Sequence, residues 1–261
     1  MGIDTLKQLY TDYVGTEPAA IDELPSSGSN RRYFRLSGAD SLIGVLGTSQ
    51  QENEAFIYMA RHFASKGLPV PEVLAVSSDS MVYLQNDLGD TLLFNAIEKG
   101  RLTHSFSVDE RQLLENTVSL LPDIQFAGAE GMDFGVCFPT ESFDERSVMW
   151  DLNYFKYCFL KATGLEFDED RLEDDFHRLS DVLMNVSCDT FMYRDFQSRN
   201  VMIKDGQPWF IDFQGGRRGP FYYDIASFLW QAKANFPDSL RHELLEVYLK
   251  SLRKYCNIGS D

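Results

Sequence analysis

The stretch Tyr193-Arg-Asp-Phe-Gln-Ser-Arg-Asn200, followed shortly by Ile211-Asp-Phe-Gln214, decides the fold. Between the two stretches lies Asp205-Gly206, flanked by apolar runs at 201–203 and 209–213. An Asp-Gly pair between two such runs is a strong local signal for a β-hairpin. Because a hairpin turns the chain back on itself, we expect the second stretch to lie beside the first.

Three oxygen-bearing side chains then converge, and together they suit phosphoryl transfer. That reaction needs a carboxylate to orient the attacking hydroxyl, and hard oxygen ligands to hold Mg²⁺ on the nucleotide phosphates. We predict Asp195 as the catalytic base, with Asn200 and Asp212 as the Mg²⁺ ligands. The Asp-x4-Asn spacing alone is unspecific, since Asp90 and Asn95 share it. Order, spacing and the hairpin context together carry the prediction.

Composition excludes several classes of protein. The 261 residues are 44% hydrophobic and 25% charged, as in an ordinary globular protein rather than a disordered or fibrous one. The net charge of −16 (24 − 40) argues against a nucleic-acid partner. The sequence shows neither a membrane-spanning run nor a signal peptide, and its four cysteines are widely spaced. We expect a cytoplasmic protein with reduced thiols; its oligomeric state is left open.

The pattern of elements predicts an α+β fold of two lobes. Residues 1–87 are expected to form a small antiparallel sheet lobe with one long helix inserted after Ser49, and residues 88–261 a larger, mainly helical lobe that carries the catalytic hairpin. Asp224 is expected to cap a helix that begins at Ile225 and to brace the catalytic loop. Strands of the sheet are expected just before the turn-rich stretch at 25–30 and at 33–36, 41–47, 72–76 and 81–85.

Several motifs resemble the aminoglycoside phosphotransferase and choline kinase family, a small-molecule branch of the protein-kinase-like fold. The resemblance covers roughly residues 24 to 250 and is greatest with the bacterial branch that includes cell-wall amino-sugar kinases, which phosphorylate N-acetylmuramate and N-acetylglucosamine at the anomeric hydroxyl. It rests on Gly28-Ser-Asn-Arg-Arg-Tyr-Phe-Arg35, Leu68-Pro-Val-Pro-Glu72, Asp87-Leu-Gly89, the two stretches quoted above, and the run from Arg218-Gly-Pro220 to Tyr223-Asp224.

The resemblance implies ATP and Mg²⁺ as cofactors and a small-molecule acceptor. It implies a hinge from Tyr83 to Asp87, between the lobes. The residues implied for the loop over the nucleotide phosphates are Gly28, Ser29 and Asn30. Those whose backbone would meet the adenine edge are Leu84, Gln85 and Asn86.

The sequence departs from the family pattern in its cations. The strand at 41–47 lacks the lysine that contacts the α- and β-phosphates in kinases. Arg31, Arg32 and Arg35 are nearby, and arginine binds phosphate through a bidentate fork; we assign Arg32 and Arg35 to the nucleotide. Without that lysine, Glu52 is interpreted as a capping-box residue rather than an ion-pair partner.

Three functional hypotheses stay open. The first is a kinase for an amino-sugar hydroxyl. The second is a kinase for an aminoglycoside or a choline-like cation, which the net charge favours slightly. The third is a nucleotide-binding or interaction protein with weak catalysis, suggested by the missing lysine, by Tyr193 in place of the usual catalytic-loop histidine and by a short helical lobe. Arg217 and Arg218 either hold a charged group of the acceptor or pair with the acidic surface.

Overall fold

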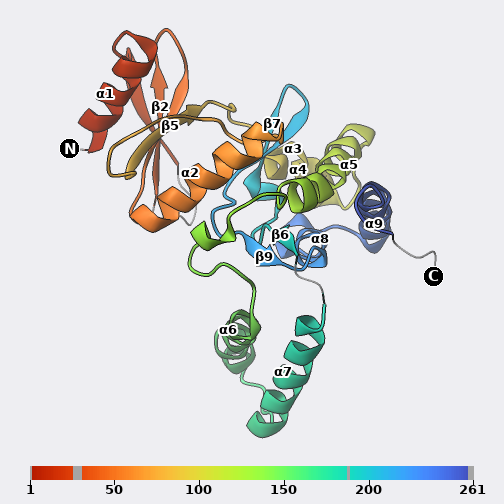
Figure 1. Ribbon diagram of the computed structural model, residues 1–261. Helices are drawn as coiled ribbons and strands as arrows, with labels where there is room; N and C mark the ends of the chain where they lie inside the picture. Colours follow the sequence, from red (N-terminus) through yellow and green to blue (C-terminus); the bar gives the residue numbers. More distant parts are fainter. Residues whose placement is uncertain (1, 26–30, 187–188, 258–261) are drawn as a thin grey trace.

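A five-stranded antiparallel sheet forms one side of the molecule, and helices form the other (Figure 1). The computed structural model describes residues 2–25, 31–186 and 189–257. The strand order is β1-β2-β3-β5-β4, so the strand expected before Pro25 and the four expected after it are confirmed. The strands are β1 Ala20–Leu24, β2 Arg32–Ser37, β3 Leu42–Leu46, β4 Val73–Val76 and β5 Val82–Asn86.

Helices cover both faces of this sheet. Helix α1, Gly2–Val14, packs on one face through Leu6 and Tyr10, and helix α2, Gln50–Ser65, lies on the other (Figure 1). Since successive side chains of a strand alternate between faces, each strand contributes to both interfaces. On the α1 face lie Phe34, Leu36 and Leu84, and on the α2 face Ile43, Val45 and Tyr83.

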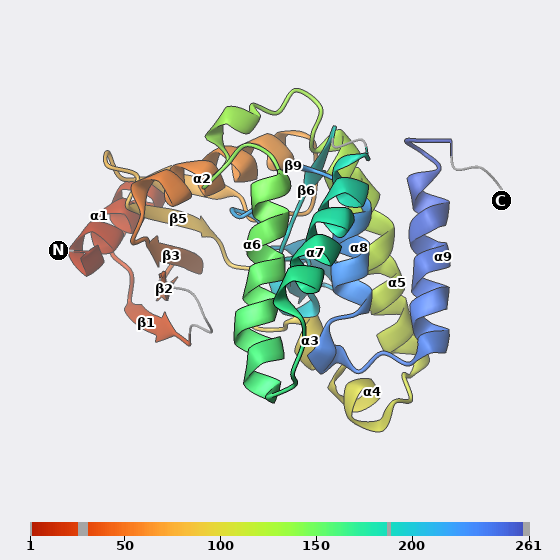
Figure 2. The same ribbon diagram turned by 90° about the horizontal axis from the view of Figure 1, so that it is seen from below.

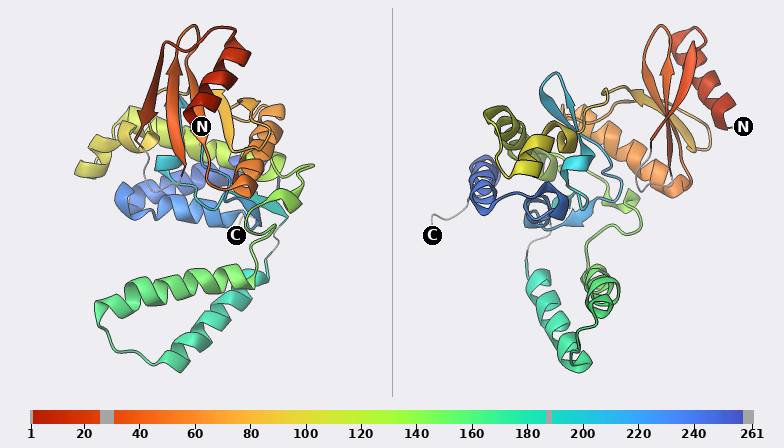
Figure 3. Two further views of the ribbon diagram at one scale, coloured as in Figure 1. Left: turned by 90° about the vertical axis from the view of Figure 1, so that its left-hand side faces the viewer. Right: turned by 180° about the vertical axis from the view of Figure 1, so that it is seen from behind.

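The helical side follows in the chain from β5. Helices α5 and α9 pack against each other (Figure 2), whereas α6 and α7 form a pair that stands away from the rest of the molecule (Figure 3). Short π-helical turns extend α5 and α6. No helix in the described part of the chain is long and apolar enough to cross a membrane. The bounds are α3 Leu93–Ala96, α4 Glu98–Thr103, α5 Val108–Pro122, α6 Glu145–Phe155, α7 Glu169–Met184, α8 Tyr222–Leu229 and α9 Asp238–Leu252.

The predicted hairpin is present, with a shorter second arm. Strands β7 (Val201–Lys204) and β8 (Gln207–Phe210) pair across a two-residue turn in which Asp205 and Gly206 both have positive φ, as a tight hairpin turn requires. The prediction that the arm runs to residue 213 is wrong, because Asp212 has φ +66°, which no strand residue adopts.

The start of α8 also differs from the prediction. The helix begins at Tyr222, so Asp224 lies inside its first turn rather than at the cap. Its side chain is fully buried and accepts a hydrogen bond from the backbone N–H of Tyr193, outside the helix. The expected capping role is therefore wrong, and the expected bracing role is described below.

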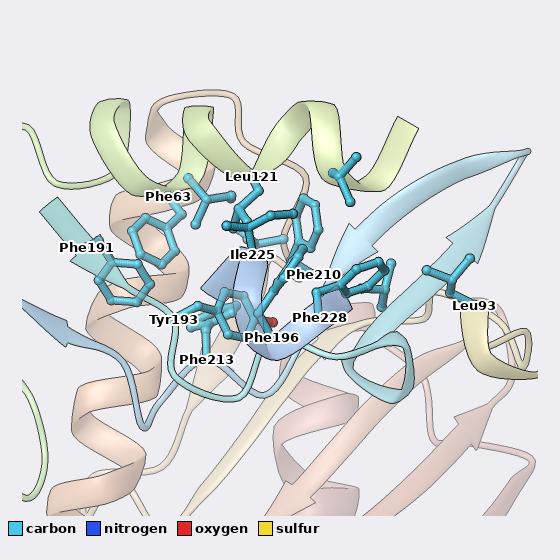
Figure 4. Close-up of a cluster of buried hydrophobic side chains, with 14 of the residues drawn as sticks. Phe63, Leu93, Leu121, Phe191, Tyr193, Phe196, Phe210, Phe213, Ile225 and Phe228 are labelled. Atoms are coloured by element: carbon cyan, nitrogen blue, oxygen red, sulfur yellow. The ribbon is translucent and has the colours of Figure 1, made fainter. Parts of the chain in front are cut away.

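Aromatic rings fill the core beneath the hairpin (Figure 4). Phe63 of α2 meets Phe191 and Phe213 edge-on, with ring centroids 5.0 and 5.3 Å apart. Phe196 packs against Phe228 of α8 at 5.1 Å. Each such pair contributes roughly 0.5–1.5 kcal/mol beyond burial of its surface. The rings come from both sides of the molecule and hold the loop that carries Asp195 between them.

Candidate active site

Two segments distant in sequence meet at the base of the hairpin. Strand β6, Thr190–Met192, pairs with β9, Arg217–Gly219, and so brings the chain before Asp195 alongside the chain after Asp212. The backbone N–H of Ile211 donates to the carbonyl of Asn200 at 3.0 Å. The convergence expected from the hairpin follows from these two backbone pairings.

Asp224 holds the loop that presents Asp195. Its carboxylate accepts the backbone N–H groups of Tyr193 and Arg194, both at 2.9 Å, and the side-chain amide of Gln125 at 2.9 Å. Arg194 has φ +73°, a left-handed conformation that is rare for a residue with a side chain. The two bonds from consecutive N–H groups fix this turn, and burial raises the pKa of Asp224 to about 7.

Tyr193 stands where kinases carry histidine, and it is structural here. Its side chain is fully buried, and its hydroxyl donates to the carbonyl of Ile211. The ring also packs edge-on against Phe196 and Phe213. Tyr193 therefore ties the first stretch of the motif to the second from below.

Asp212 occupies a strained backbone position. At φ +66° it lies in the left-handed region, and such residues cluster at functional sites, where surrounding packing enforces them. Its Oδ1 accepts the side-chain amide of Gln214 at 2.7 Å. This conformation turns the chain so that the side chain of Phe213 is buried in the core while that of Asp212 stays partly exposed.

The two carboxylates influence each other. Partial desolvation raises the pKa of Asp195, and the negative charge of Asp212 raises it further. Arg194 and Arg217 act in the opposite direction. Asp195 itself is exposed at the surface of the site, so a substrate hydroxyl can reach it from solvent.

A hollow of about 500 Å³, called the cleft below, opens between the sheet and the hairpin. Its walls are apolar near the sheet and polar near the motif: Tyr33, Ile43 and Tyr83 line one side, Asn200 and Asp212 the other. Its volume lies in the range of small-molecule and cofactor sites. The arrangement suits a flat apolar group beneath the sheet and a charged group near Asp212.

Comparison with known families gives one decisive match. Residues 20–256 match the model of the phosphotransferase enzyme family, known as APH. The chain belongs to this family. The expected family resemblance is thereby confirmed over most of the sequence.

Two curated relatives are N-acetylmuramate/N-acetylglucosamine kinases. The protein of Pseudomonas aeruginosa is 27% identical over 239 residues, which are 89% of this chain and 66% of the relative. The protein of Neisseria meningitidis is 26% identical over 232 residues, 85% of this chain and 65% of the relative. The APH chain described here thus spans about two thirds of the length of these relatives.

Solved structures share the fold. The ADP-bound aminoglycoside phosphotransferase APH(2'')-Ib superposes with a TM-score of 0.67 at 14% identity, over 97% of this chain and 86% of that one. A choline/ethanolamine kinase family protein from Mesorhizobium loti gives 0.60 at 16% identity, over 96% and 76%. The expected two-sided, kinase-like α+β fold is confirmed.

The residues assigned to the nucleotide lie in three different situations. Gly28, Ser29 and Asn30 are outside the described residues. Gln85 and Asn86 line the cleft, whereas the side chain of Leu84 is buried on the α1 face. The backbone N–H of Asn86 already donates to the carbonyl of Glu72, so this donor is engaged within the sheet lobe. The adenine contacts stay a prediction.

Both assigned arginines are paired with carboxylates. Arg32 forms an exposed two-bond pair with Glu23, each bond 2.8 Å long. Arg35 is bound by Asp87 at 2.7 Å and by Asp90 at 2.8 Å. It therefore fastens β2 to the segment that follows β5.

Arg31 takes a position that the sequence analysis did not favour. Its side chain is 2% exposed, and its guanidinium lies 3.2 Å from the carboxylate of Glu52 on α2. Ser49 does cap α2, accepting the N–H of Glu52 at 3.4 Å, but the carboxylate of Glu52 pairs with Arg31. An arginine–glutamate pair thus joins the start of β2 to α2, whereas kinases join their third strand to a helix by a lysine–glutamate pair.

Strand alternation could have excluded Arg32. Phe34 and Leu36 face α1, so odd-numbered residues of this strand face the side of the cleft. Arg32 has the wrong parity. Arg31, directly before the strand, and Arg35 both have the right one, and Arg35 is paired with Asp87 and Asp90.

Arg217 and Arg218 lie in different surroundings. Arg217 is 3% exposed and donates to the carbonyl of Gly215 and to the hydroxyl of Thr140. Arg218 is partly exposed, lies over the ring of Phe134 and has Asp189 3.9 Å away. The hypothesis that these arginines pair with the acidic surface holds for Arg218, which forms an ion pair with Asp189. Arg217 instead donates to neutral oxygens.

The residues at the motif fit a magnesium ion that is shared with phosphates. The amide nitrogen of Asn200 donates to the backbone carbonyl of Asp195 at 2.8 Å. Since that carbonyl can only accept, the bond fixes the amide orientation and directs the side-chain oxygen elsewhere. The described residues contain no cluster of three His, Cys, Asp or Glu side chains that could hold a metal. One carboxylate and one amide oxygen are a typical protein contribution to Mg²⁺ held by a nucleotide.

Proposed function

We propose that this protein transfers a phosphoryl group from ATP, with Mg²⁺, to a hydroxyl of an amino sugar. The observation that carries the proposal is that Asn200 and Asp212 line a cleft of nucleotide size, while Asp195 lies directly beside them on the catalytic loop. Membership of the phosphotransferase family supports the reaction class. The names of the two curated relatives support an amino-sugar acceptor.

In this proposal Asp195 acts directly on the acceptor. Its carboxylate accepts a hydrogen bond from the attacking hydroxyl and takes the proton as the phosphoryl group is transferred. The raised pKa of Asp195 makes the carboxylate a better proton acceptor than an ordinary aspartate. Asp224 and Tyr193 keep its loop in place, because positioning supplies much of the rate enhancement in phosphoryl transfer.

Other residues of the cleft bind the nucleotide. Asn200 and Asp212 would hold Mg²⁺, which when bound neutralises charge that develops on the phosphate oxygens. Arg31, buried beside the sheet and held by Glu52, would provide a cation for the phosphates. Tyr33 and Tyr83 give the purine an apolar wall.

The test is ATP consumption with Mg²⁺ across a panel of acceptors. The panel contains N-acetylmuramate, N-acetylglucosamine, glucose, an aminoglycoside and choline, and Asp195→Asn is the control. Turnover that depends on an amino sugar and falls at least about a thousandfold in the control would support the proposal. Turnover with the aminoglycoside or choline alone would show that the acceptor is not an amino sugar. Turnover that is unaffected by Asp195→Asn would show that Asp195 is not the base.

A further inference from the structure

A second hollow, called the side hollow, adjoins the cleft at the catalytic loop. It has a volume of about 490 Å³, and Asp195, Arg199, Trp230 and Lys233 are among its lining residues. Arg199 also lines the cleft, so the two hollows share one wall. Asp195 lines only the side hollow. A hydroxyl bound there at Asp195 would therefore lie next to the contents of the cleft.

The shared wall is held in position by a stack of three side chains. The guanidinium carbon of Arg101 lies 3.5 Å from the ring centroid of Phe94, and that of Arg199 lies 4.4 Å from it. Arg101 is buried and also donates to the carbonyl of Phe94 at 2.9 Å. Cation–π contacts of this kind orient a guanidinium without neutralising its charge. The ring of Phe94 thus holds the guanidinium of Arg199 at the wall between the two hollows.

The charge of the side hollow is opposite to that of the whole protein. The chain carries a net charge of −16, yet the ionisable lining of this hollow is two cations, Arg199 and Lys233, and the single carboxylate of Asp195. Within the described residues, neither Arg199 nor Lys233 forms an ion pair with a carboxylate. In so acidic a chain, two cations without acidic partners beside the reacting carboxylate indicate an anionic ligand.

The other lining groups suit a ring with polar edges. Trp230 is 61% exposed, an unusual position for the largest apolar side chain, and it presents part of its surface to the hollow. Gln197 and Ser227 add side chains that can hydrogen-bond to hydroxyl groups. An indole surface together with amide and hydroxyl groups is suited to a sugar ring.

We propose that the side hollow binds the acceptor, and that the acceptor is a sugar with an anionic group, a carboxylate or a phosphate, that is held by Lys233 and Arg199. This inference rests on the proposed function and specifies the class of its substrate. The sugar lies against Trp230 with one hydroxyl at Asp195. Lys233 recognises the charge of the acceptor, whereas Arg199, at the shared wall, reaches both the acceptor and the transferred phosphoryl group.

Two sugars that differ in one charged substituent test this inference. N-acetylmuramate is N-acetylglucosamine with a lactyl carboxylate, and N-acetylglucosamine 6-phosphate adds a phosphate instead. The wild type is expected to prefer one of the two anionic sugars over the neutral one by kcat/KM. Lys233→Ala should lower that preference about tenfold or more, since a charge-assisted hydrogen bond contributes about 1.5–3 kcal/mol. Lys233→Arg should restore most of it, and Lys250→Ala, an exposed lysine on α9, should leave it unchanged.

Binding measurements separate failure of this inference from failure of the proposed function. If the wild type turns over no acceptor, the proposed function fails, and titration of the same three sugars against the fluorescence of Trp230 then tests the hollow alone. Trp230→Phe identifies the signal of that residue. Anionic sugar binding that Lys233→Ala weakens would sustain the anionic site. A wild type that prefers the neutral sugar, or a Lys233→Ala variant that keeps the full preference, would overturn it.

Discussion

The ring of Phe213 stacks on the ring of Phe56, with centroids 5.0 Å apart and planes inclined by 13°. Phe56 belongs to α2, and Phe213 follows the proposed metal ligand Asp212 directly in the chain. Helix α2, whose Glu52 pairs with Arg31, therefore also contacts Phe213, the residue next to Asp212. This contact couples the sheet side of the cleft to the motif side.

Replacing the ring of Phe213 by a smaller side chain should affect activity more than stability. Phe213→Leu is expected to lower the free energy of unfolding by about 1–2 kcal/mol, because it leaves part of the ring volume empty. ATP turnover should fall by roughly tenfold or more, since Asp212 loses the support for its left-handed backbone. Urea unfolding and turnover by the same preparation measure the two effects.

Phe106→Leu provides the matched control for that variant. Phe106 is 6% exposed and packs edge-on against Phe236, with no contact to the motif. It should lose similar stability and retain most of its turnover. If both variants lose turnover in proportion to stability, Phe213 is an ordinary core residue.

Arg31 should govern the affinity for ATP. Arg31→Met is expected to lower kcat/KM for ATP by roughly 10- to 100-fold, as expected for the loss of a charge-assisted contact with phosphate. Arg32→Met should change kcat/KM by less than about twofold, because Arg32 pairs with Glu23 at an exposed site outside the cleft. Initial rates at varied ATP concentration measure both. A large loss in Arg32→Met with none in Arg31→Met would reverse the assignment.

Two neighbouring glycines after Asp212 should respond differently to alanine. A Cβ at Gly216 would lie 2.1 Å from the ring of Phe191, whereas a Cβ at Gly215 would lie 3.7 Å from Asp195 Oδ2. Gly216→Ala should therefore destabilise the protein by about 1–3 kcal/mol through overpacking. Gly215→Ala should change stability by less than about 1 kcal/mol. Thermal unfolding of the two variants would show this difference, and equal losses would contradict it.

The hairpin and the sheet could be predicted from the sequence because local patterns determine them. Asp205-Gly206 requires positive φ at both positions, and the flanking runs alternate correctly. The end of the second arm could not be predicted, since Ile211 and Phe213 are apolar enough to continue a strand. What ends it is tertiary: Phe213 packs among rings from α2, which forces the turn at Asp212.

The motif residues and the arginine proposed for the phosphates differ in how far a local pattern determines their positions. Asp195 and Asn200 occur in one short segment, and a local pattern brings them together. Arg31 depends on its position relative to Glu52, 21 residues later on another element, and two neighbouring arginines compete for the same role. Strand parity excludes Arg32 but not Arg35, which only the tertiary structure shows to be paired with Asp87 and Asp90. The hydrogen bonds between Asp224 and the catalytic loop are equally non-local, because Asp224 lies on a helix more than 20 residues downstream of that loop.

The buried carboxylate of Asp224 should make stability depend on pH. Its folded-state pKa is about 7, against 3.8 for an ordinary aspartate, so between these values the folded protein binds a proton that the unfolded chain releases. This stabilisation is complete below pH 3.8 and declines up to pH 7, by as much as about 1.4 kcal/mol per pH unit. Asp224→Asn should remove this slope, and Asp174→Asn, at an exposed site on α7, should retain it. Urea unfolding at pH 5 and pH 7 gives the difference; parallel profiles for the wild type and Asp224→Asn would show that Asp224 is ionised throughout.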